Sequence, residues 1–283
     1  MRFAVVSDTH LAPPGTADGR WNNVTRVSAS RELLDAVVAE IAAAGHDRVL
    51  LLGDISDLGV EEAIATVVET ISDAGMQVWA VPGNHDVRSS QDAFADALRD
   101  SAMGVALRME HGDSNPEVVV SGHGLRAEDV GGRFVATDLP DLAPVQAQLL
   151  VWATHFPVLS QETRLLAEGL RYPGDLLNLA DVQSSVSRFH GPALVLHGHL
   201  HAAVVAQAGQ ILQIGVPAVV EWPHAWTDAS IEFTTDTVTV QTTLIPIPGA
   251  WSNRDVNTVL AEPEQCWVFE TGRWRQTPAS DPR

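Results

Sequence analysis

The sequence predicts an α/β fold in which parallel strands alternate with helices. Two observations in the first third of the chain support this prediction. Short apolar runs of the length of a buried strand alternate with longer segments whose apolar residues recur at helical spacing. A glycine also follows each helical segment, as expected at the end of a helix. The resulting β-α-β-α-β order is typical of parallel strands joined by crossover helices.

The elements of the first third can be assigned in chain order. They are a strand at residues 3–6, a helix at 31–44, a strand at 49–52, a helix at 61–74 and a strand at 78–81. The apolar period of the first helix consists of Leu33, Leu34, Val37, Val38 and Ile41. The second helix repeats it with Ile64, Val67, Val68 and Ile71.

The rest of the chain is predicted to be richer in strands. We expect short strands within 104–137, buried strands at 149–153 and 193–196, a helix at 179–189, and further short strands within 203–245. One domain, residues 1–248, is expected, followed by a C-terminal tail, residues 249–283. The tail shows little periodicity, and we expect it to pack on the domain or to act as a lid or an oligomer contact. The oligomeric state is left open.

Composition limits the classes of partner. Apolar residues make up 45% of the 283 residues, so a sizeable core can form. The formal net charge is −19, from 36 acidic and 17 basic side chains. Such a surface repels a phosphate polymer unless basic residues are gathered locally, and no run of Lys or Arg is present. Long nucleic acid is therefore not expected as a partner, whereas a small anion is, because bound cations can invert the local field.

Cysteine content and hydropathy indicate the cellular setting. The single cysteine, Cys266, excludes an intramolecular disulfide and a thiolate zinc cluster. The N-terminus turns polar after about six residues, which is too short for the apolar region of a signal peptide. No apolar stretch approaches the ~20 residues that a membrane span needs. We therefore expect a cytoplasmic protein that has no membrane partner.

Five polar clusters share one placement, since each directly follows an apolar run. They are Asp8-Thr9-His10, Gly53-Asp54-Ile55-Ser56-Asp57, Gly83-Asn84-His85-Asp86, Thr154-His155 and His197-Gly198-His199-Leu200-His201. In an open α/β sheet, ligands bind outside the carboxyl ends of the strands. If the runs are neighbouring strands, all five clusters should converge there.

The side chains in these clusters are of the kind that binds metal ions. Asp8 and His10 are two residues apart, as are His199 and His201, and residues so spaced point the same way in extended backbone. Carboxylate, imidazole and amide oxygen donors suit Mn, Fe or Zn. Seven candidate ligands are too many for one zinc ion, but they fit two metals if one carboxylate bridges, and Asp54 stands in the middle of the series. The candidates are Asp8, His10, Asp54, Asn84, His155, His199 and His201.

Taken in order, the five clusters resemble the pattern of the calcineurin-like metallophosphoesterase family. That pattern reads D-x-H, G-D-x-x-D, G-N-H-(D/E), a lone His and G-H-x-H, and the match spans residues 8–201. The resemblance implies a four-layer α/β/β/α sandwich of two packed mixed sheets flanked by helices. It also implies that one metal takes Asp8, His10, Asp54 and His201. The second metal would take Asp54, Asn84, His155 and His199.

The resemblance further implies a hydrolase of phosphate esters that uses two divalent or mixed-valence metal ions. Two cations about 3.5–4 Å apart lower the pKa of a bridging water and bind the attacking and departing oxygens, so a metal-bridging hydroxide is the expected nucleophile. His85 and Asp86 are the candidate catalytic residues. We expect His85 to contact the substrate and protonate the leaving group, with Asp86 orienting the ring and raising its pKa.

Departures from the patterns of known subfamilies narrow the choice of subfamily that this chain resembles. Leu58 stands where protein Ser/Thr phosphatases have Arg, and Asp57 stands where purple acid phosphatases have Tyr. The overall arrangement resembles that of bacterial cyclic-nucleotide phosphodiesterases, except that residues 138–148 are too few for the helix expected before His155. This shortening is expected to change the shape of the substrate pocket.

The leading hypothesis is a phosphodiesterase or phosphatase acting on a small phosphorylated molecule, with a (cyclic) nucleotide as first choice. The alternatives are a catalytically idle metal-binding scaffold for protein interaction and a nuclease, which the net charge disfavours. Arg20, Arg88 and Arg164 are candidate phosphate clamps, and residues 221–224 are a candidate border of the site. The remaining histidines are expected to have surface or structural roles, and they are His46, His111, His123, His190, His197 and His224.

Overall fold

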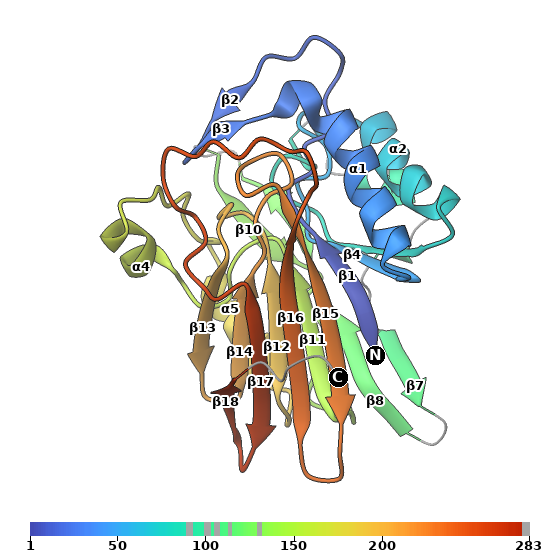
Figure 1. Ribbon diagram of the computed structural model, residues 1–283. Coiled ribbons are helices and arrows are strands. Elements are labelled where there is room, and N and C mark those ends of the chain that lie inside the picture. Colours follow the sequence, from blue (N-terminus) through green and yellow to red (C-terminus); the bar gives the residue numbers. More distant parts are fainter. Residues whose placement is uncertain (89–92, 99–102, 105–107, 113–114, 129–131, 279–283) are drawn as a thin grey trace.

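Two β-sheets pack face to face at the centre of the molecule, and helices cover the outer face of each. The computed structural model describes residues 1–88, 93–98, 103–104, 108–112, 115–128 and 132–278 (Figure 1). In that part of the chain, no helix combines the length and the apolar character needed to cross a membrane.

The first sheet is mixed and has the strand order β18-β17-β16-β15-β1-β4-β5-β6. Strands β1, β4, β5 and β6 run parallel to one another, and β15 joins β1 in the antiparallel sense. The strands are β1 (Arg2–Val6), β4 (Arg48–Leu51), β5 (Gln77–Ala80), β6 (Met103–Gly104), β15 (Ala225–Phe233), β16 (Val238–Pro246), β17 (Glu264–Glu270) and β18 (Arg273–Thr277).

The second sheet is also mixed and has the order β13-β14-β12-β11-β8-β7. Strands β8, β11, β12 and β14 are parallel, and β7 and β13 are antiparallel edge strands. The strands are β7 (Arg108–Gly112), β8 (Asn115–Ser121), β11 (Leu149–Thr154), β12 (Ala193–His197), β13 (Val204–Ala208) and β14 (Ile211–Gly215).

The remaining elements are helices and two small strand pairs. The helices are η1 (Val27–Ala29), α1 (Ser30–Ala43), α2 (Glu61–Asp73), α3 (Ala93–Leu98), α4 (Glu162–Ala167) and α5 (Leu179–Ser187). The pairs are β2 (Gly19–Arg20) with β3 (Val24–Thr25), and β9 (Gly124–Ala127) with β10 (Phe134–Thr137).

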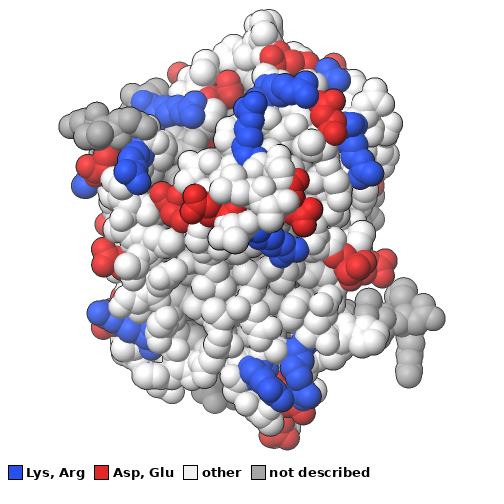
Figure 2. Space-filling view, turned by 90° about the vertical axis from the view of Figure 1, so that its left-hand side faces the viewer, with Lys and Arg blue, Asp and Glu red and all other residues white. Residues whose placement is uncertain are grey.

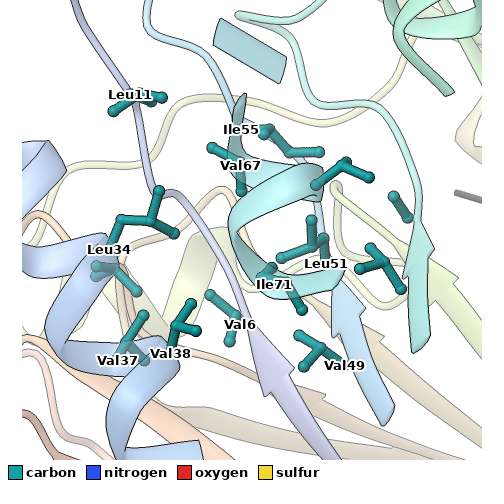
Figure 3. Packing of buried hydrophobic residues seen from close by; sticks show 14 of the residues in the cluster. Val6, Leu11, Leu34, Val37, Val38, Val49, Leu51, Ile55, Val67 and Ile71 are labelled. Atoms are coloured by element: carbon teal, nitrogen blue, oxygen red, sulfur yellow. The ribbon is translucent and has the colours of Figure 1, made fainter. Parts of the chain in front are cut away.

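The alternation of side chains along each buried strand produces the layers. Val6 and Leu51 face α1 and α2, together with Val49 (Figure 3). Val5 and Leu50, one position along, face the second sheet. Residues of the second sheet that point outward pack against α5 in the same way. The predicted α/β/β/α sandwich of two mixed sheets is therefore confirmed.

The predicted elements of the first third are confirmed to within one or two residues at each end. The tail contains strands that the sequence pattern did not predict. Residues 264–277 form β17 and β18, which extend the first sheet. These strands bury Trp267 and Trp274 but otherwise leave many side chains half-buried or exposed, so they lack a clear apolar alternation. The pattern also gives no sign of α3 and α4, since six residues are too few to show a helical period.

Asp228 of β15 ties the start of the chain to the region after α1. Arg2 donates through Nε to Asp228 Oδ1 at 3.1 Å, and His46 Nε2 lies 3.3 Å from the same oxygen. Burial raises the pKa of Asp228, but hydrogen bonding and charge from His46 and Arg2 outweigh it and lower the pKa to about 2. Because this pKa lies below that of the unfolded chain, ionised Asp228 stabilises the fold above about pH 4, and the stabilisation disappears as the pH falls toward 2.

We therefore expect Asp228→Asn to lower the free energy of unfolding by about 1–2 kcal/mol at pH 7, after allowance for solvent screening. The difference from wild type should shrink steadily below about pH 4. Urea unfolding at pH 7, 5 and 3 measures it, with the exposed Asp236→Asn as control. An equal loss at all three pH values would show that the carboxylate charge is not responsible.

Candidate metal centre

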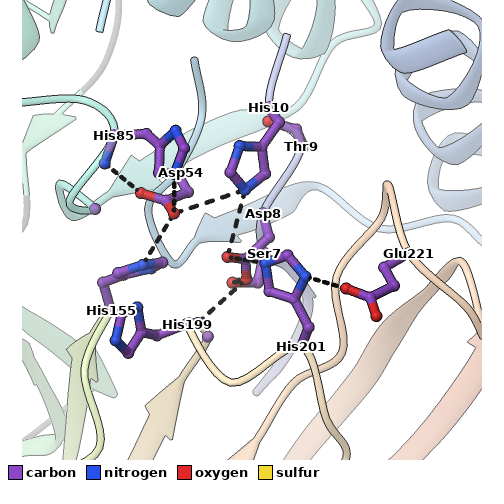
Figure 4. Close-up of polar contacts among 12 residues, drawn as sticks. Ser7, Asp8, Thr9, His10, Asp54, His85, His155, His199, His201 and Glu221 are labelled. Atoms are coloured by element: carbon purple, nitrogen blue, oxygen red, sulfur yellow. Dashed lines mark hydrogen bonds and ion pairs between the residues drawn. The ribbon is translucent and has the colours of Figure 1, made fainter. Parts of the chain in front are cut away.

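The five polar clusters meet in one cavity at the carboxyl ends of β1, β4, β5, β11 and β12 (Figure 4). The cavity has a volume of about 730 Å³. The predicted site residues that line it are His10, Asp54, Asn84, His85, His199 and His201. Asp8 and His155 lie beneath them and are almost completely buried. All seven predicted metal-ligand candidates therefore gather in one place.

The backbone at these positions differs from the extended form that the sequence suggests. Five of the candidates have positive φ, and they are Asp8 (55°), His10 (42°), Asp54 (49°), His199 (65°) and His201 (50°). Non-glycine residues adopt this left-handed region rarely and at a cost of order 1–3 kcal/mol each. The prediction of extended backbone at these i, i+2 pairs is therefore wrong, and left-handed residues after the strands bring the side chains together. Five strained positions in one cavity indicate a functional site.

Asp8 is the centre of a first group of donors. Its Oδ1 lies 3.2 Å from His201 Nε2 and 3.9 Å from His10 Nε2. His10 Nε2 is also 3.6 Å from Asp54 Oδ2, so Asp54 adjoins this group. Asp8, His10 and His201 place one donor atom each within 4.8 Å of one another.

Asp54 is the centre of a second group. His155 Nε2 lies 3.3 Å from Asp54 Oδ2 and 3.1 Å from Asn84 Oδ1, and the ring of His199 stacks edge-on against that of His155 at 4.9 Å. Figure 4 shows Asp54 between the rings of His10, His85 and His155. One carboxylate thus adjoins both groups.

The donors of both groups are suited to cations. Burial raises the pKa of Asp8, but His201 and other neighbours outweigh it and lower the pKa to about 2. Burial likewise opposes ionisation of Asp54, yet His155 and other imidazoles hold its pKa well below the ordinary value. Among the described residues, the buried atoms without a hydrogen bond include Asp8 Oδ1, His10 Nε2 and His199 Nε2. Ionised carboxylates, imidazoles and unpartnered donor atoms fit two metal ions with N and O ligands.

Two glycines allow the loops after β4 and β5 to approach closely. A Cβ at Gly83 would lie 2.1 Å from the backbone nitrogen of Asp54, and one at Gly53 would lie 2.5 Å from that of Gly83. No side chain fits at either place, and Gly53 also has φ of +85°. The absence of side chains here brings Asp54 and Asn84 into the same site.

His85 faces the cavity, but its neighbours differ from those expected. Its Nδ1 lies 2.6 Å from the backbone oxygen of Asp57 and 3.6 Å from Asp57 Oδ1. Asp86 is fully buried instead, and its carboxylate accepts hydrogen bonds from the backbone N–H groups of Ile55, Ser56 and Gly83. The residue beside the ring is therefore Asp57, and Asp86 organises the turns. The expected rise in pKa is also absent, because burial lowers the pKa of His85 more than Asp54 raises it.

The comparison with known families matches this arrangement of donors. The model of the calcineurin-like phosphoesterase family matches residues 1–203. This chain belongs to that family. As a calcineurin-like phosphoesterase it is a hydrolase of phosphoric esters, and the family uses a dinuclear metal centre. In this chain, the two donor groups around Asp8 and Asp54 contain the candidate ligands for such a centre.

Curated relatives of this phosphoesterase are similar at low identity. A probable cyclic nucleotide phosphodiesterase of Coxiella burnetii is 31% identical over 88 residues, which are 30% of this chain and 32% of that protein. The matched region thus spans about a third of that relative's length. A probable cyclic nucleotide phosphodiesterase of Fibrobacter succinogenes is 23% identical over 212 residues, covering 73% of this chain and 75% of that protein.

Solved structures share the fold of this phosphoesterase. A dimetal phosphatase from Danio rerio superposes with a TM-score of 0.60 at 15% identity, covering 87% of this chain and 98% of that one. Phosphopantetheinyl hydrolase from Mycobacterium tuberculosis superposes with a TM-score of 0.52 at 14% identity, covering 78% of this chain and 91% of that one.

Basic and aromatic side chains form the outer wall of the phosphoesterase cavity. Arg20 and Arg88, two of the predicted phosphate clamps, line it, as does Arg133, which the sequence analysis missed. The third predicted clamp, Arg164, is engaged elsewhere, since it donates to the backbone oxygens of Val205 and Leu260. The aromatic residues of the wall are Trp21, Phe134 and Phe156.

The other histidines whose side chains the structure describes lie outside the cavity lining. His123 is hydrogen-bonded to Thr154, His46 approaches Asp228, and His224 Nδ1 donates to the backbone oxygen of Val219. His197 is fully buried beside Gly215, and burial lowers its pKa to about 4. His190 is exposed, and the side chain of His111 lies outside the described residues.

Proposed function

We propose that this phosphoesterase hydrolyses a small phosphate ester, with a cyclic nucleotide or another nucleotide as the first candidate. The observation that carries the proposal is the convergence of seven N and O donors in one cavity whose outer wall bears three arginines. The names of the two curated relatives support a cyclic nucleotide. The cavity volume of about 730 Å³ is within the range of small-molecule sites.

The two donor groups would each hold one metal ion, and Asp54 would contribute to both. The first set of ligands is Asp8, His10, Asp54 and His201. The second set is Asp54, Asn84, His155 and His199. Mn, Fe and Zn suit this mixture of carboxylate, imidazole and amide donors. When bound, two such cations supply an activated water and neutralise charge on the phosphoryl oxygens.

His85 is proposed as the proton donor to the departing oxygen. Its Nδ1 contacts the backbone oxygen of Asp57, which leaves Nε2 directed toward Asp54 Oδ2 at 3.9 Å. An anionic substrate beside the ring favours the charged imidazolium and opposes the effect of burial on its pKa. Arg88 Nη1 lies 3.1 Å from His85 Nδ1, close enough for the guanidinium to donate to a phosphoryl oxygen beside the ring.

The charge distribution favours small substrates over polymers. Figure 2 shows arginine and acidic side chains interspersed on one face, without a continuous basic band among the described residues drawn. The net charge of −19 repels a long phosphate chain, whereas Arg20, Arg88 and Arg133 are gathered at the cavity. This arrangement draws a small anion into the site without providing a track for nucleic acid.

A substrate panel tests the proposal. Metal-stripped protein should turn over no ester, and added Mn²⁺ should restore turnover of bis(p-nitrophenyl) phosphate and of 3′,5′- and 2′,3′-cyclic nucleotides. A chelator should abolish it again. An idle scaffold would bind Mn²⁺ but turn over none of these esters. A nuclease would degrade long RNA or DNA at physiological salt faster than any small ester. Either result would replace the proposed function.

A further inference from the structure

Glu221 is a buried carboxylate in the part of the chain that follows the family match, which ends at residue 203. Its side chain is completely inaccessible to solvent. Oε2 lies 2.6 Å from His201 Nδ1, and Oε1 accepts a hydrogen bond from the backbone N–H of Asn23. A buried carboxylate is costly unless both oxygens have partners, and here each oxygen has one. Glu221 thereby links a proposed metal ligand to a segment nearly 200 residues away.

The segment held by Glu221 is the pair β2–β3, residues 19–25, which forms part of the cavity wall. Arg20, Trp21 and Thr25 of this pair line the cavity. Thr25 is also joined to Glu221 by a backbone bridge. The C-terminal segment supports the pair from outside, because Asn23 Oδ1 accepts hydrogen bonds from the backbone N–H groups of residues 255 and 256 at 2.7 and 3.0 Å.

The contact with His201 determines which ring nitrogen is free. A carboxylate can only accept, so His201 Nδ1 donates to Glu221, which leaves Nε2 as the ring nitrogen that can bind a metal. His201 Nε2 is the atom directed at Asp8, at 3.2 Å. A partner of this kind fixes the tautomer and the ring orientation of a metal-binding histidine.

We propose that Glu221 is a positioning residue that orients His201 for metal binding and anchors the cavity wall carrying Arg20 and Trp21. The proposal rests on the proposed function, since it treats His201 as a metal ligand. It assigns two tasks to one side chain, and each has its own measurement.

The variant Glu221→Gln tests the first task, because glutamine has the same shape but only one accepting oxygen. That oxygen can face His201 or Asn23, but not both. Loss of such a partner typically costs 10–100-fold in metal affinity. Titration of metal-stripped protein with Mn²⁺, followed by the EPR signal of the free ion, should show weakening of this size. The exposed Glu232→Gln serves as the matched control and should bind like wild type. Affinity within twofold of wild type for Glu221→Gln would overturn the proposal.

Steady-state kinetics test the second task, which is anchoring the cavity wall. NMR determines the tautomer of His201. At saturating Mn²⁺, Glu221→Gln should raise KM more than it lowers kcat, because the wall bearing Arg20 and Trp21 loses an anchor. In Zn²⁺-loaded wild type with ¹⁵N-labelled histidine, His201 should show a protected proton on Nδ1, with its signals assigned from His201→Ala. A bare Nδ1 would refute the assignment even if the variant failed to fold.

The variant His201→Ala distinguishes failure of the proposed metal site from failure of the role proposed for Glu221. If wild type binds Mn²⁺ and His201→Ala binds it as tightly, the proposed metal site is wrong. If His201→Ala loses affinity while Glu221→Gln keeps it, only the role of Glu221 is wrong.

Discussion

Replacing Asp54 with asparagine is expected to lower the occupancy of both metal ions together and to reduce turnover more than about 10²-fold, as loss of groups that stabilise transition-state charge does. Asp54 Oδ2 lies 3.3 Å from His155 Nε2 and 3.6 Å from His10 Nε2, so it adjoins both donor groups. Asparagine keeps the shape but lacks the negative charge that two cations would share. Elemental analysis of purified protein, together with turnover at saturating substrate, measures both effects.

Asn84→Ala provides the contrast, because Asn84 Oδ1 contacts His155 Nε2 in the second donor group. This variant should lose one ion and keep the other. A full pair of ions in Asp54→Asn would disprove the bridging role. Loss of a single ion there, matching Asn84→Ala, would place Asp54 in one site only.

Replacing His85 with alanine is expected to slow hydrolysis of alkyl phosphate esters by ~10²–10⁴-fold, the usual cost of removing a general acid. The ring faces the cavity, and its backbone N–H donates to Asp54 Oδ1 at 2.7 Å, a bond that alanine retains. Both metal ions should therefore remain bound. The rate of nitrophenyl ester hydrolysis should fall much less, because nitrophenolate can depart without being protonated, whereas an alkoxide needs a proton to depart.

The ratio of the rates for alkyl and nitrophenyl esters is the decisive quantity. The exposed His190→Ala is the matched control and should leave both rates unchanged. If His85→Ala loses a metal ion, His85 is a ligand. If it slows all esters equally, His85 binds the phosphoryl group without transferring a proton.

The donor set at the centre of the cavity could be predicted from sequence because each donor follows a strand directly. Parallel strands end at the same edge of a sheet, so their order along the chain is enough to bring such residues together. Asp8 after β1, Asp54 after β4 and Asn84 after β5 follow this rule. The helices α1 and α2 were equally predictable, since their apolar period covers more than three turns.

The partners of these donors depend on contacts that no local pattern encodes. Asp86 directly follows His85 in the sequence, which predicts that the two side chains interact. In the structure, the Asp86 carboxylate instead accepts hydrogen bonds from backbone N–H groups of the loop about 30 residues earlier. Burial likewise overrode the expected rise in the pKa of His85. Such outcomes follow from how closely two loops pack, which here depends on Gly53 and Gly83.

The fold class and the seven candidate ligands could therefore be predicted from the sequence, because strand order and residue type are local properties. The surroundings of those ligands depend on the tertiary structure instead. Glu221 reaches His201 across 20 residues and Asn23 across 198, and Arg133 joins Arg20 at one cavity wall. The physical reason is that hydrogen bonds and cavity walls form between segments brought together by burial of the core, and their separation along the chain has no fixed spacing to recognise.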